Sequence, residues 1–201
     1  LDDLAQCKVG HNSDPIGCER YITAWDIGRR QDHTVGVTIG RRDEVWHVVA
    51  YERMLVPYPV VQRRIEERAR QYRGKTVIES NGVGDPVIEN LSCRVDPYTT
   101  TTKTKTQAIQ ALQLLIQQGR FKHNEEQLDR ELSLYQWRDD GLIQDSVMAA
   151  AIAAMTAVPP PSLIGQAIAA EMSTPREVTT QERLAERRAR LAAAGGRRGW
   201  R

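Results

Sequence analysis

The sequence has no long hydrophobic run and no recognisable secretion signal. Its most apolar stretch, Val147 to Val158, is rich in alanine and only 12 residues long, whereas a membrane-spanning helix needs about 18 or more consecutive apolar residues. The chain begins at Leu1 rather than at a methionine, and no basic, apolar and small-residue series follows it. We therefore expect no membrane role, and a starting point that lies inside a longer protein.

Cysteine is scarce, and no CxxC pair is present. The three cysteines, Cys7, Cys18 and Cys93, form an odd set without repeated spacing, which favours reduced thiols in a cytoplasmic setting. Cys7, His11 and Cys18 supply three ligands for a possible zinc site, but no fourth ligand follows at a familiar spacing. The alternative is that residues 1–19 form a leader without a site.

The chain also has little net charge, but that charge is unevenly distributed. The segment 174–201 holds eight Arg against three Glu, so a formal total of +2 leaves −3 for everything before it. A basic tail on an acidic body suits contact with nucleic acid or an acidic partner; the alternative is a solvated, charged helix. The content of 40% hydrophobic and 27% charged residues is that of one ordinary globular domain with appendages.

Hydrophobic periodicity predicts an α/β domain over residues 20–158. We expect five strands, at 21–26, 34–39, 44–53, 76–79 and 95–98, and helices at 60–72, 85–91, 106–119, 125–137 and 145–158. The order βββαβαβ followed by helices predicts a mixed sheet of the RNase H-like type, with an antiparallel meander on one side. The last helix is almost wholly apolar and should lie against the sheet. Residues 159–201 read as a helical, basic C-terminal appendage with a disordered end.

Three acidic residues stand at the ends of these elements. Asp26 closes the first strand, Glu79 closes the fourth, and Asp145 opens the apolar helix. Carboxylates in these places converge, and the repulsion between them is costly without counter-ions. Hard oxygen ligands select Mg²⁺ or Mn²⁺, and two such ions can hold the attacking water and the leaving 3′ oxygen of a phosphodiester.

Each acid also has an ordinary structural interpretation. Asp26 would be a turn residue before Gly28, Glu79 would pair with an arginine, and Asp145 would be the N-cap of its helix. It is the joint placement of the three that favours a metal-dependent hydrolytic site.

The residues around the acids resemble a known family. The strings AWDIGRRQDHT (24–34), VIESNGVG (77–84) and QDSVMAAAIA (144–153) are similar, in order and spacing, to the three acidic motifs in the nuclease domain of phage terminase large subunits. The segments 103–123 and 128–132 resemble the lysine-led helix and the ELxxY-like element of that family. The resemblance covers roughly residues 20–158, and the ordered set is more specific than any one motif.

The resemblance implies an RNase H-like endonuclease that cuts concatemeric double-stranded DNA during viral genome packaging in the host-cell cytoplasm. It implies two-metal hydrolysis with Mg²⁺ or Mn²⁺ held by Asp26, Glu79 and Asp145. The partners it implies are an upstream ATPase motor, the portal protein and the small terminase subunit. This chain has no GxxxxGK[ST] phosphate loop of its own.

Further site residues follow from the same resemblance. Asp32 is either a further acid at the rim or a hairpin-turn residue. Ser146 stands where many relatives carry a second acid, which bears on the geometry of the second metal. Lys103 and Lys105, just before a helix, either hold phosphates of the DNA or form a solvated helix start.

Two glycines and a histidine have paired interpretations as well. Gly82 and Gly84 either let the backbone approach a bound DNA strand or form a plain tight turn. His33 either takes part in proton transfer or is an ordinary surface histidine.

Three other functions fit parts of the sequence. The string DIGRRQDHT also resembles the phosphate loop of actin-like and sugar-kinase ATPases, but those enzymes close two such domains over the nucleotide. A junction-resolving or RNase H-type nuclease would use a similar carboxylate cluster, because the fold does not separate these substrates. A non-catalytic docking module for the portal or a partner subunit is the alternative from another class.

Overall fold

The computed structural model describes residues 2–8, 17–29, 32–81, 84–135 and 144–158. The elements, in chain order, are α1 (Asp2–Cys7), β1 (Arg20–Asp26), β2 (Thr34–Arg42), β3 (Val45–Met54), α2 (Tyr58–Tyr72), β4 (Lys75–Glu79), α3 (Gly84–Glu89), β5 (Asp96–Tyr98), α4 (Thr102–Gln117), β6 (Phe121–Lys122), α5 (Glu126–Leu134) and α6 (Asp145–Ala157). The predicted appendage, residues 159–201, lies outside the described residues. Within the described segments, no helix combines the length and apolar character that crossing a membrane requires.

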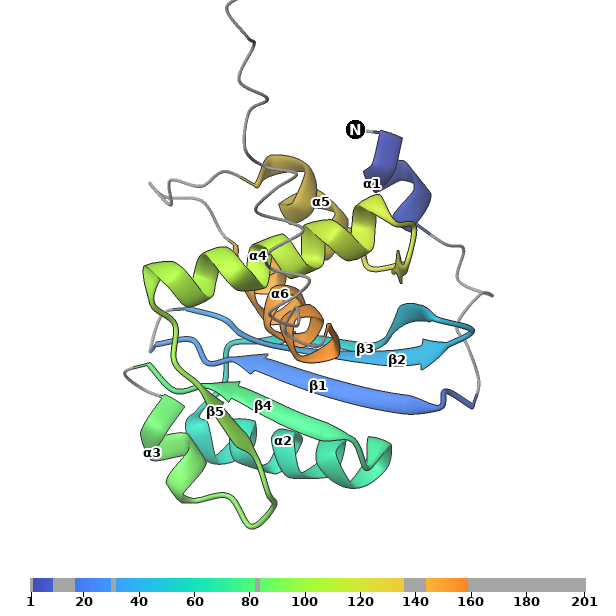
Figure 1. Cartoon of the computed structure of the whole chain (residues 1–201). Helices are drawn as coiled ribbons and strands as arrows, with labels where there is room; N and C mark the ends of the chain where they lie inside the picture. The colour runs from blue at the N-terminus through green and yellow to red at the C-terminus, as the bar shows by residue number, and fades with distance from the viewer. Residues whose placement is uncertain (1, 9–16, 30–31, 82–83, 136–143, 159–201) are drawn as a thin grey trace, which may run out of the picture. The chain divides into compact units, whose positions relative to one another are not determined.

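The strands form one mixed sheet in the order β5-β4-β1-β2-β3-β6 (Figure 1). β1, β2 and β3 are an antiparallel meander, β4 runs parallel to β1, and β5 runs parallel to β4. This confirms the predicted RNase H-like mixed sheet. The prediction of five strands was one short, because β6 pairs with β3 over only two residues and so shows no alternation.

The meander turns at Asp43 and Glu44, whose φ angles are 49° and 64°. Positive φ at both central residues gives a primed turn, whose twist matches that of the strands it joins. The strand β2 therefore continues to Arg42, further than predicted, and the turn lies later in the chain.

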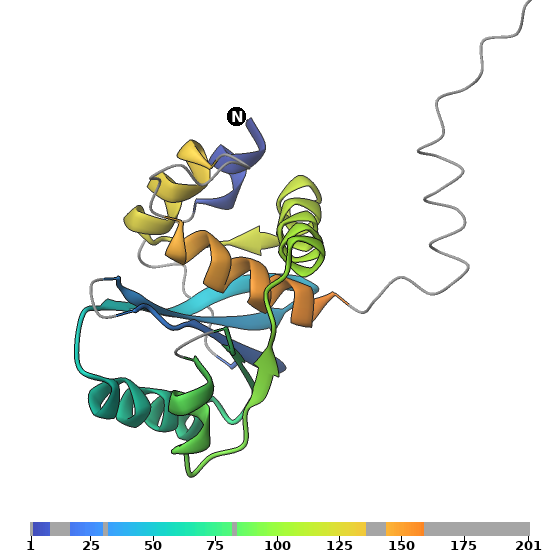
Figure 2. The same cartoon turned by 90° about the vertical axis from the view of Figure 1, so that its left-hand side faces the viewer.

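Helices cover the sheet on both faces (Figures 1 and 2). On one face, Trp25 and Ile78 pack with Val61 and Ile65 of α2. On the other face, α4 and α6 lie over the sheet, and every residue of α6 from 146 to 154 is buried. The prediction that this apolar helix lies against the sheet is confirmed, since its many alanines permit close approach.

Residues 2–8, which the sequence places in a leader, pack against the body. The side chain of Cys7 is fully buried, and its carbonyl accepts the backbone N–H of His123 at 2.9 Å. The thiol of Cys7 donates to the carbonyl of Asp3 at 3.3 Å. In the described segments no three His, Cys, Asp or Glu side chains are arranged to bind a metal, and His11 lies outside them, so the zinc hypothesis gains no support.

Candidate active site

Asp26 and Glu79 are the last residues of two neighbouring parallel strands, β1 and β4. Side chains alternate along a strand, so Asp26 shares a face with Ala24, and Glu79 shares a face with Val77. Both Ala24 and Val77 belong to the core under α6. The two carboxyl groups meet there and share a side-chain hydrogen bond, which requires either a shared proton or a cation between them.

Asp145 is the first residue of α6, and Gln144, not Asp145, is the N-cap of that helix. The N-cap interpretation of Asp145 is therefore wrong. Because α6 packs across β1 and β2, its first turn brings Asp145 to the edge where Asp26 and Glu79 lie. The charge of Asp145 acts on Asp26. The structure thus brings the three predicted acids to one edge of the sheet.

Burial and like charge raise the pKa of two of these acids. Burial raises the pKa of Asp26 well above its ordinary value, and the charge of Glu79 and the hydrogen bond to it add to the effect. The pKa of Asp145 is also raised, first by burial and then by Glu131, against the opposing effect of Arg53. Two ionised carboxylates in such a place are stabilised by a hard cation, which prefers oxygen ligands.

The three acids do not form a closed ligand cage. No three candidate side chains in the described ranges stand together at coordinating distance. Asp26 and Glu79 are the close pair, and Asp145 acts on Asp26 by charge alone. Three like charges keep this spacing for electrostatic reasons, and the oxygen-only donor set fits Mg²⁺ or Mn²⁺ better than zinc.

Gly84 is buried at the start of α3. A Cβ atom at this position would lie 1.8 Å from the carbonyl oxygen of Glu79, so no other residue fits without a shift of the backbone. This contact, rather than contact with DNA, accounts for the glycine. Gly82 lies outside the described residues.

Asp32 is exposed in the loop between β1 and β2. Its backbone N–H donates to the carbonyl of Arg29 at 2.8 Å, which makes a turn. A Cβ at Gly28 would lie 2.4 Å from the Asp32 carbonyl, so the loop is tight. The charges of Asp32 and His33 both act on Asp145. Asp32 is therefore a turn residue and also a charge at the rim of the acidic site.

Lys103 and Lys105 lie inside the first turn of α4, whereas the sequence placed them before it. Thr101 caps this helix: its hydroxyl accepts the backbone N–H of Thr104 at 3.1 Å, and the two residues form a capping box. Lysines are unfavourable at this positive end of a helix. Helix stability therefore does not account for them.

The start of α4 is held beside Glu79. Asn81 donates from Nδ2 to the carbonyl of Thr100 at 2.6 Å, and Ser80 shares a hydrogen bond with Thr99 at 3.1 Å. α4 consequently begins on the side of the molecule where β1 and β4 end (Figure 1). Lys103 and Lys105 are carried on the same side as the acids.

Ser146 is fully buried, and its hydroxyl points away from the pair formed by Asp26 and Glu79. It donates to Glu131 of α5 at 2.8 Å and shares a hydrogen bond with the Tyr51 hydroxyl at 2.8 Å. The departure from a second acid at this position therefore places a buried hydroxyl in a network with α5 and β3.

A family model described as "Terminase RNaseH-like domain" matches residues 23–136. The chain belongs to this family. No curated protein sequence matched the chain.

Solved structures show the same fold for this terminase domain. The large terminase nuclease of the thermophilic phage G20c, with bound magnesium, aligns with a TM-score of 0.61 and 23% identity, over 67% of this chain and 80% of that one. The Thermus phage P74-26 large terminase nuclease domain aligns with a TM-score of 0.58 and 19% identity, over 67% and 77%. The large terminase of another thermophilic bacteriophage aligns with a TM-score of 0.64 and 11% identity, over 77% of this chain and 43% of that longer chain.

A cationic side chain in the terminase domain, missed from the sequence, faces the acids. In the strand register, Asp26 of β1 pairs with Val35 of β2, which pairs with Arg53 of β3. The three residues form one row across the sheet, so their side chains share the face under α6. The Nε atom of Arg53 is buried without a hydrogen-bond partner. The signal was present, since Arg53 continues the alternation of a strand, but only the register places it opposite Asp26.

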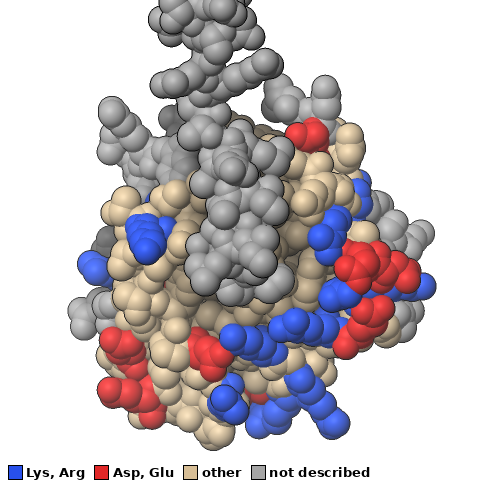
Figure 3. Space-filling model, in the orientation of Figure 1, with Lys and Arg blue, Asp and Glu red and all other residues tan. Residues whose placement is uncertain are grey.

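The positive surface elsewhere is matched by acids. Figure 3 shows a band of Lys and Arg on the side where β1 and β4 begin, with acidic side chains among them. Lys75 pairs with Asp96 at 3.0 Å, and Arg120 pairs with Glu44 at 3.3 Å. Exposed pairs of this kind contribute little to stability, and they leave no strongly basic surface on this face.

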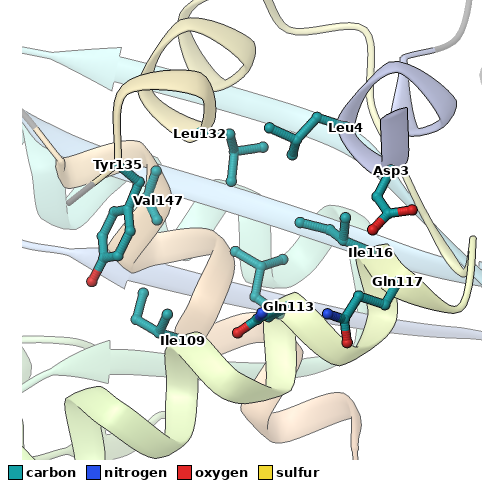
Figure 4. Close-up of a pocket in the computed structure, with 10 residues that line it drawn as sticks. Asp3, Leu4, Ile109, Gln113, Ile116, Gln117, Leu132, Tyr135 and Val147 are labelled. Carbon is teal, nitrogen blue, oxygen red and sulfur yellow. The ribbon is translucent and has the colours of Figure 1, made fainter. Parts of the chain in front are cut away.

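A hollow of about 370 Å³ lies between α1, α4, α5 and α6. Figure 4 shows Leu4, Ile116 and Leu132 pointing into it, with Tyr135 and Val147 at one end. The lining is mostly apolar and includes none of the three predicted ligands, so this hollow lacks the donor set of the acidic site.

Proposed function

We propose that this terminase domain is a metal-dependent endonuclease that cuts double-stranded DNA during viral genome packaging. The observation that carries the proposal is the buried pair of Asp26 and Glu79, with Asp145 beside it at the end of the sheet. The G20c nuclease, solved with bound magnesium, cobalt or zinc, supports a divalent-cation site in this fold.

Asp26, Glu79 and Asp145 would hold the metal through carboxylate oxygens. Two bound Mg²⁺ or Mn²⁺ ions would supply an activated water and stabilise the leaving 3′ oxygen of an in-line phosphodiester displacement. The residues of the chain hold these carboxylates at one place and exclude water from one side by the packing of α6.

Arg53, Lys103 and Lys105 would bind the phosphates of the DNA. Arg53 shares the row of Asp26, and its Nε is free of protein partners in the described segments; a guanidinium suits a phosphate because its donors form a planar fork. The lysines would contact phosphates next to the cleaved bond. Contacts of this kind are independent of base sequence.

The domain would act in the host-cell cytoplasm as one part of a packaging motor. The chain spans less than half of the longest of the three large terminases compared above, a protein also solved in complex with ADP. An ATPase motor upstream of this domain, the portal protein and the small terminase subunit are the partners that we propose.

Plasmid cleavage by the purified chain tests the proposal. Nicking and linearisation are expected in Mn²⁺ or Mg²⁺ and not in EDTA. The substitutions Asp26→Asn and Asp145→Asn should each abolish both products. Asp43→Asn is the matched control, because Asp43 is an exposed acid in the β2–β3 turn, and it should cleave like the native chain.

Two outcomes would contradict the proposal. Cleavage that survives both substitutions would come from another site or from a contaminating nuclease. A folded chain that cleaves in no metal would favour the non-catalytic docking module.

A further inference from the structure

The first turn of α6 is fixed by a buried carboxylate from another helix. A helix begins with backbone N–H groups that have no partner inside the helix, and Gln144, the N-cap of α6, forms no side-chain cap. Instead, Glu131 of α5 accepts the N–H of Ser146 at 2.8 Å and the N–H of Val147 at 3.3 Å. It also accepts the hydroxyl of Ser146 at 2.8 Å.

Glu131 is only 4% exposed, and both of its oxygens are occupied. One oxygen accepts the two backbone N–H groups, and the other accepts the Ser146 hydroxyl and the Gln127 amide, the latter at 2.8 Å. A buried carboxylate is stable only with such partners, and the positive end of a helix adds to its stability. Glu131 thus has no oxygen left to serve as a metal ligand without breaking this cap.

The same cap is tied to the sheet. The hydroxyl of Tyr51, on β3, shares a hydrogen bond with that of Ser146 at 2.8 Å. Tyr51 lies two residues before Arg53, on the same face of β3. The residue immediately before Ser146 is Asp145, so the start of α6 is fixed to α5 and β3 at the point where the third acid leaves the helix.

We propose that Glu131 is a positioning residue for Asp145, which, through its cap on α6 and the hydrogen bond between Ser146 and Tyr51, sets the third carboxylate of the metal site. The inference deepens the proposed function, since it rests on Asp145 being a metal ligand. It also explains the serine that follows Asp145: its hydroxyl completes the cap.

Titration of the whole chain with Mn²⁺, followed by calorimetry, tests the inference without relying on cleavage. Glu131→Gln keeps the shape of the side chain but loses the charge and one acceptor. It should weaken Mn²⁺ binding about tenfold or more, as the loss of groups that orient metal ligands commonly does. Ser146→Ala and Tyr51→Phe leave the charge of Glu131 in place and should weaken binding in the same direction by less.

Controls separate positioning from stability. Glu126→Gln removes an exposed acid from the same helix and should bind Mn²⁺ like the native chain. Each variant's unfolding midpoint is measured alongside. With Glu131→Gln, excess Mn²⁺ should restore most of the cleavage rate, because the ligands remain and only their placement has changed.

Native Mn²⁺ affinity in a folded Glu131→Gln variant would overturn the inference. If that variant does not fold, native affinity in both Ser146→Ala and Tyr51→Phe would overturn it. Weakened Mn²⁺ binding in these variants, with no DNA cleavage by the native chain, would support the inference and contradict the proposed function. A native chain that binds no Mn²⁺ would overturn both.

Discussion

Asp26 bears the electrostatic strain of the proposed site. Burial and Glu79 raise its pKa well above the ordinary value for an aspartate, so the folded chain keeps a proton that the unfolded chain loses. Stability therefore falls as the pH rises from about the unfolded pKa through the raised folded pKa, and the full loss is present above that window. A bound cation reverses this loss, because it favours the ionised carboxylates.

Asp26→Asn should therefore make the metal-free chain more stable at neutral pH and abolish its stabilisation by Mg²⁺. Thermal unfolding at about pH 5 and about pH 8, with Mg²⁺ or with EDTA, measures both effects. In the native chain, Mg²⁺ should raise the midpoint more at the higher pH than at the lower, since protons compete for the same oxygens. A lower midpoint for Asp26→Asn in EDTA, with Asp43→Asn unchanged, would show that Asp26 carries no such strain.

Gly84 gives a steric test of how Glu79 is placed. Gly84→Ala would put a Cβ 1.8 Å from the Glu79 carbonyl, so the start of α3 and the end of β4 must separate. Overpacking of this kind costs about 1–3 kcal/mol. We expect urea unfolding to show that loss, together with weaker Mn²⁺ binding.

The control for Gly84 is Gly119→Ala. Gly119 has φ +67° and open space around it, so alanine there costs about 1–2 kcal/mol of backbone strain and should leave Mn²⁺ binding unchanged. Equal Mn²⁺ affinity in both variants would mean that Gly84 does not control the position of Glu79.

At the scale of elements, periodicity predicts most of the fold. Alternation gives β1 to β5, and the apolar run gives α6, because each pattern is local in the chain. It also places Asp26, Glu79 and Asp145, since each stands at an element's end. Glu131 was beyond prediction: its partners are backbone N–H groups of another helix, and only the packed structure brings them together.

The two lysines of α4 show the same limit. The sequence placed the helix start at 106, since its apolar period begins there, whereas the cap at Thr101 extends α4 back over Lys103 and Lys105. A capping box that uses Thr104 in place of Glu or Gln departs from the usual sequence signature.

Thr101→Ala should remove this cap and destabilise the domain by about 0.5–2 kcal/mol. Because the cap also fixes the first turn of α4, DNA binding should weaken with it. Chemical unfolding and a DNA-binding titration measure the two effects. Thr102→Ala, a change at the next and equally exposed position, is the control and should alter neither; equal losses from both substitutions would assign the effect to helix propensity instead of the cap.

At the scale of the whole molecule, the distribution of charge governs how DNA is held. The chain before residue 174 carries a formal charge of −3, and the basic band in Figure 3 is interspersed with acids. Binding should therefore depend on a few phosphate contacts near the site. Each contact contributes about −0.9 to the slope of log affinity against log salt concentration on duplex DNA.

Lys103→Gln combined with Lys105→Gln should accordingly make that slope shallower by about 1.8 and weaken binding equally on DNA of any sequence. Any contribution from the arginines of segment 174–201 is present in both chains and leaves the difference unchanged. Lys75→Gln is the matched control, because Lys75 begins β4, at the end opposite Glu79, and pairs with Asp96. Titrations between about 50 and 200 mM salt measure the slopes. An unchanged slope in the double variant would remove both lysines from the DNA-binding surface, and an equal change in Lys75→Gln would place the DNA across the far end of the sheet.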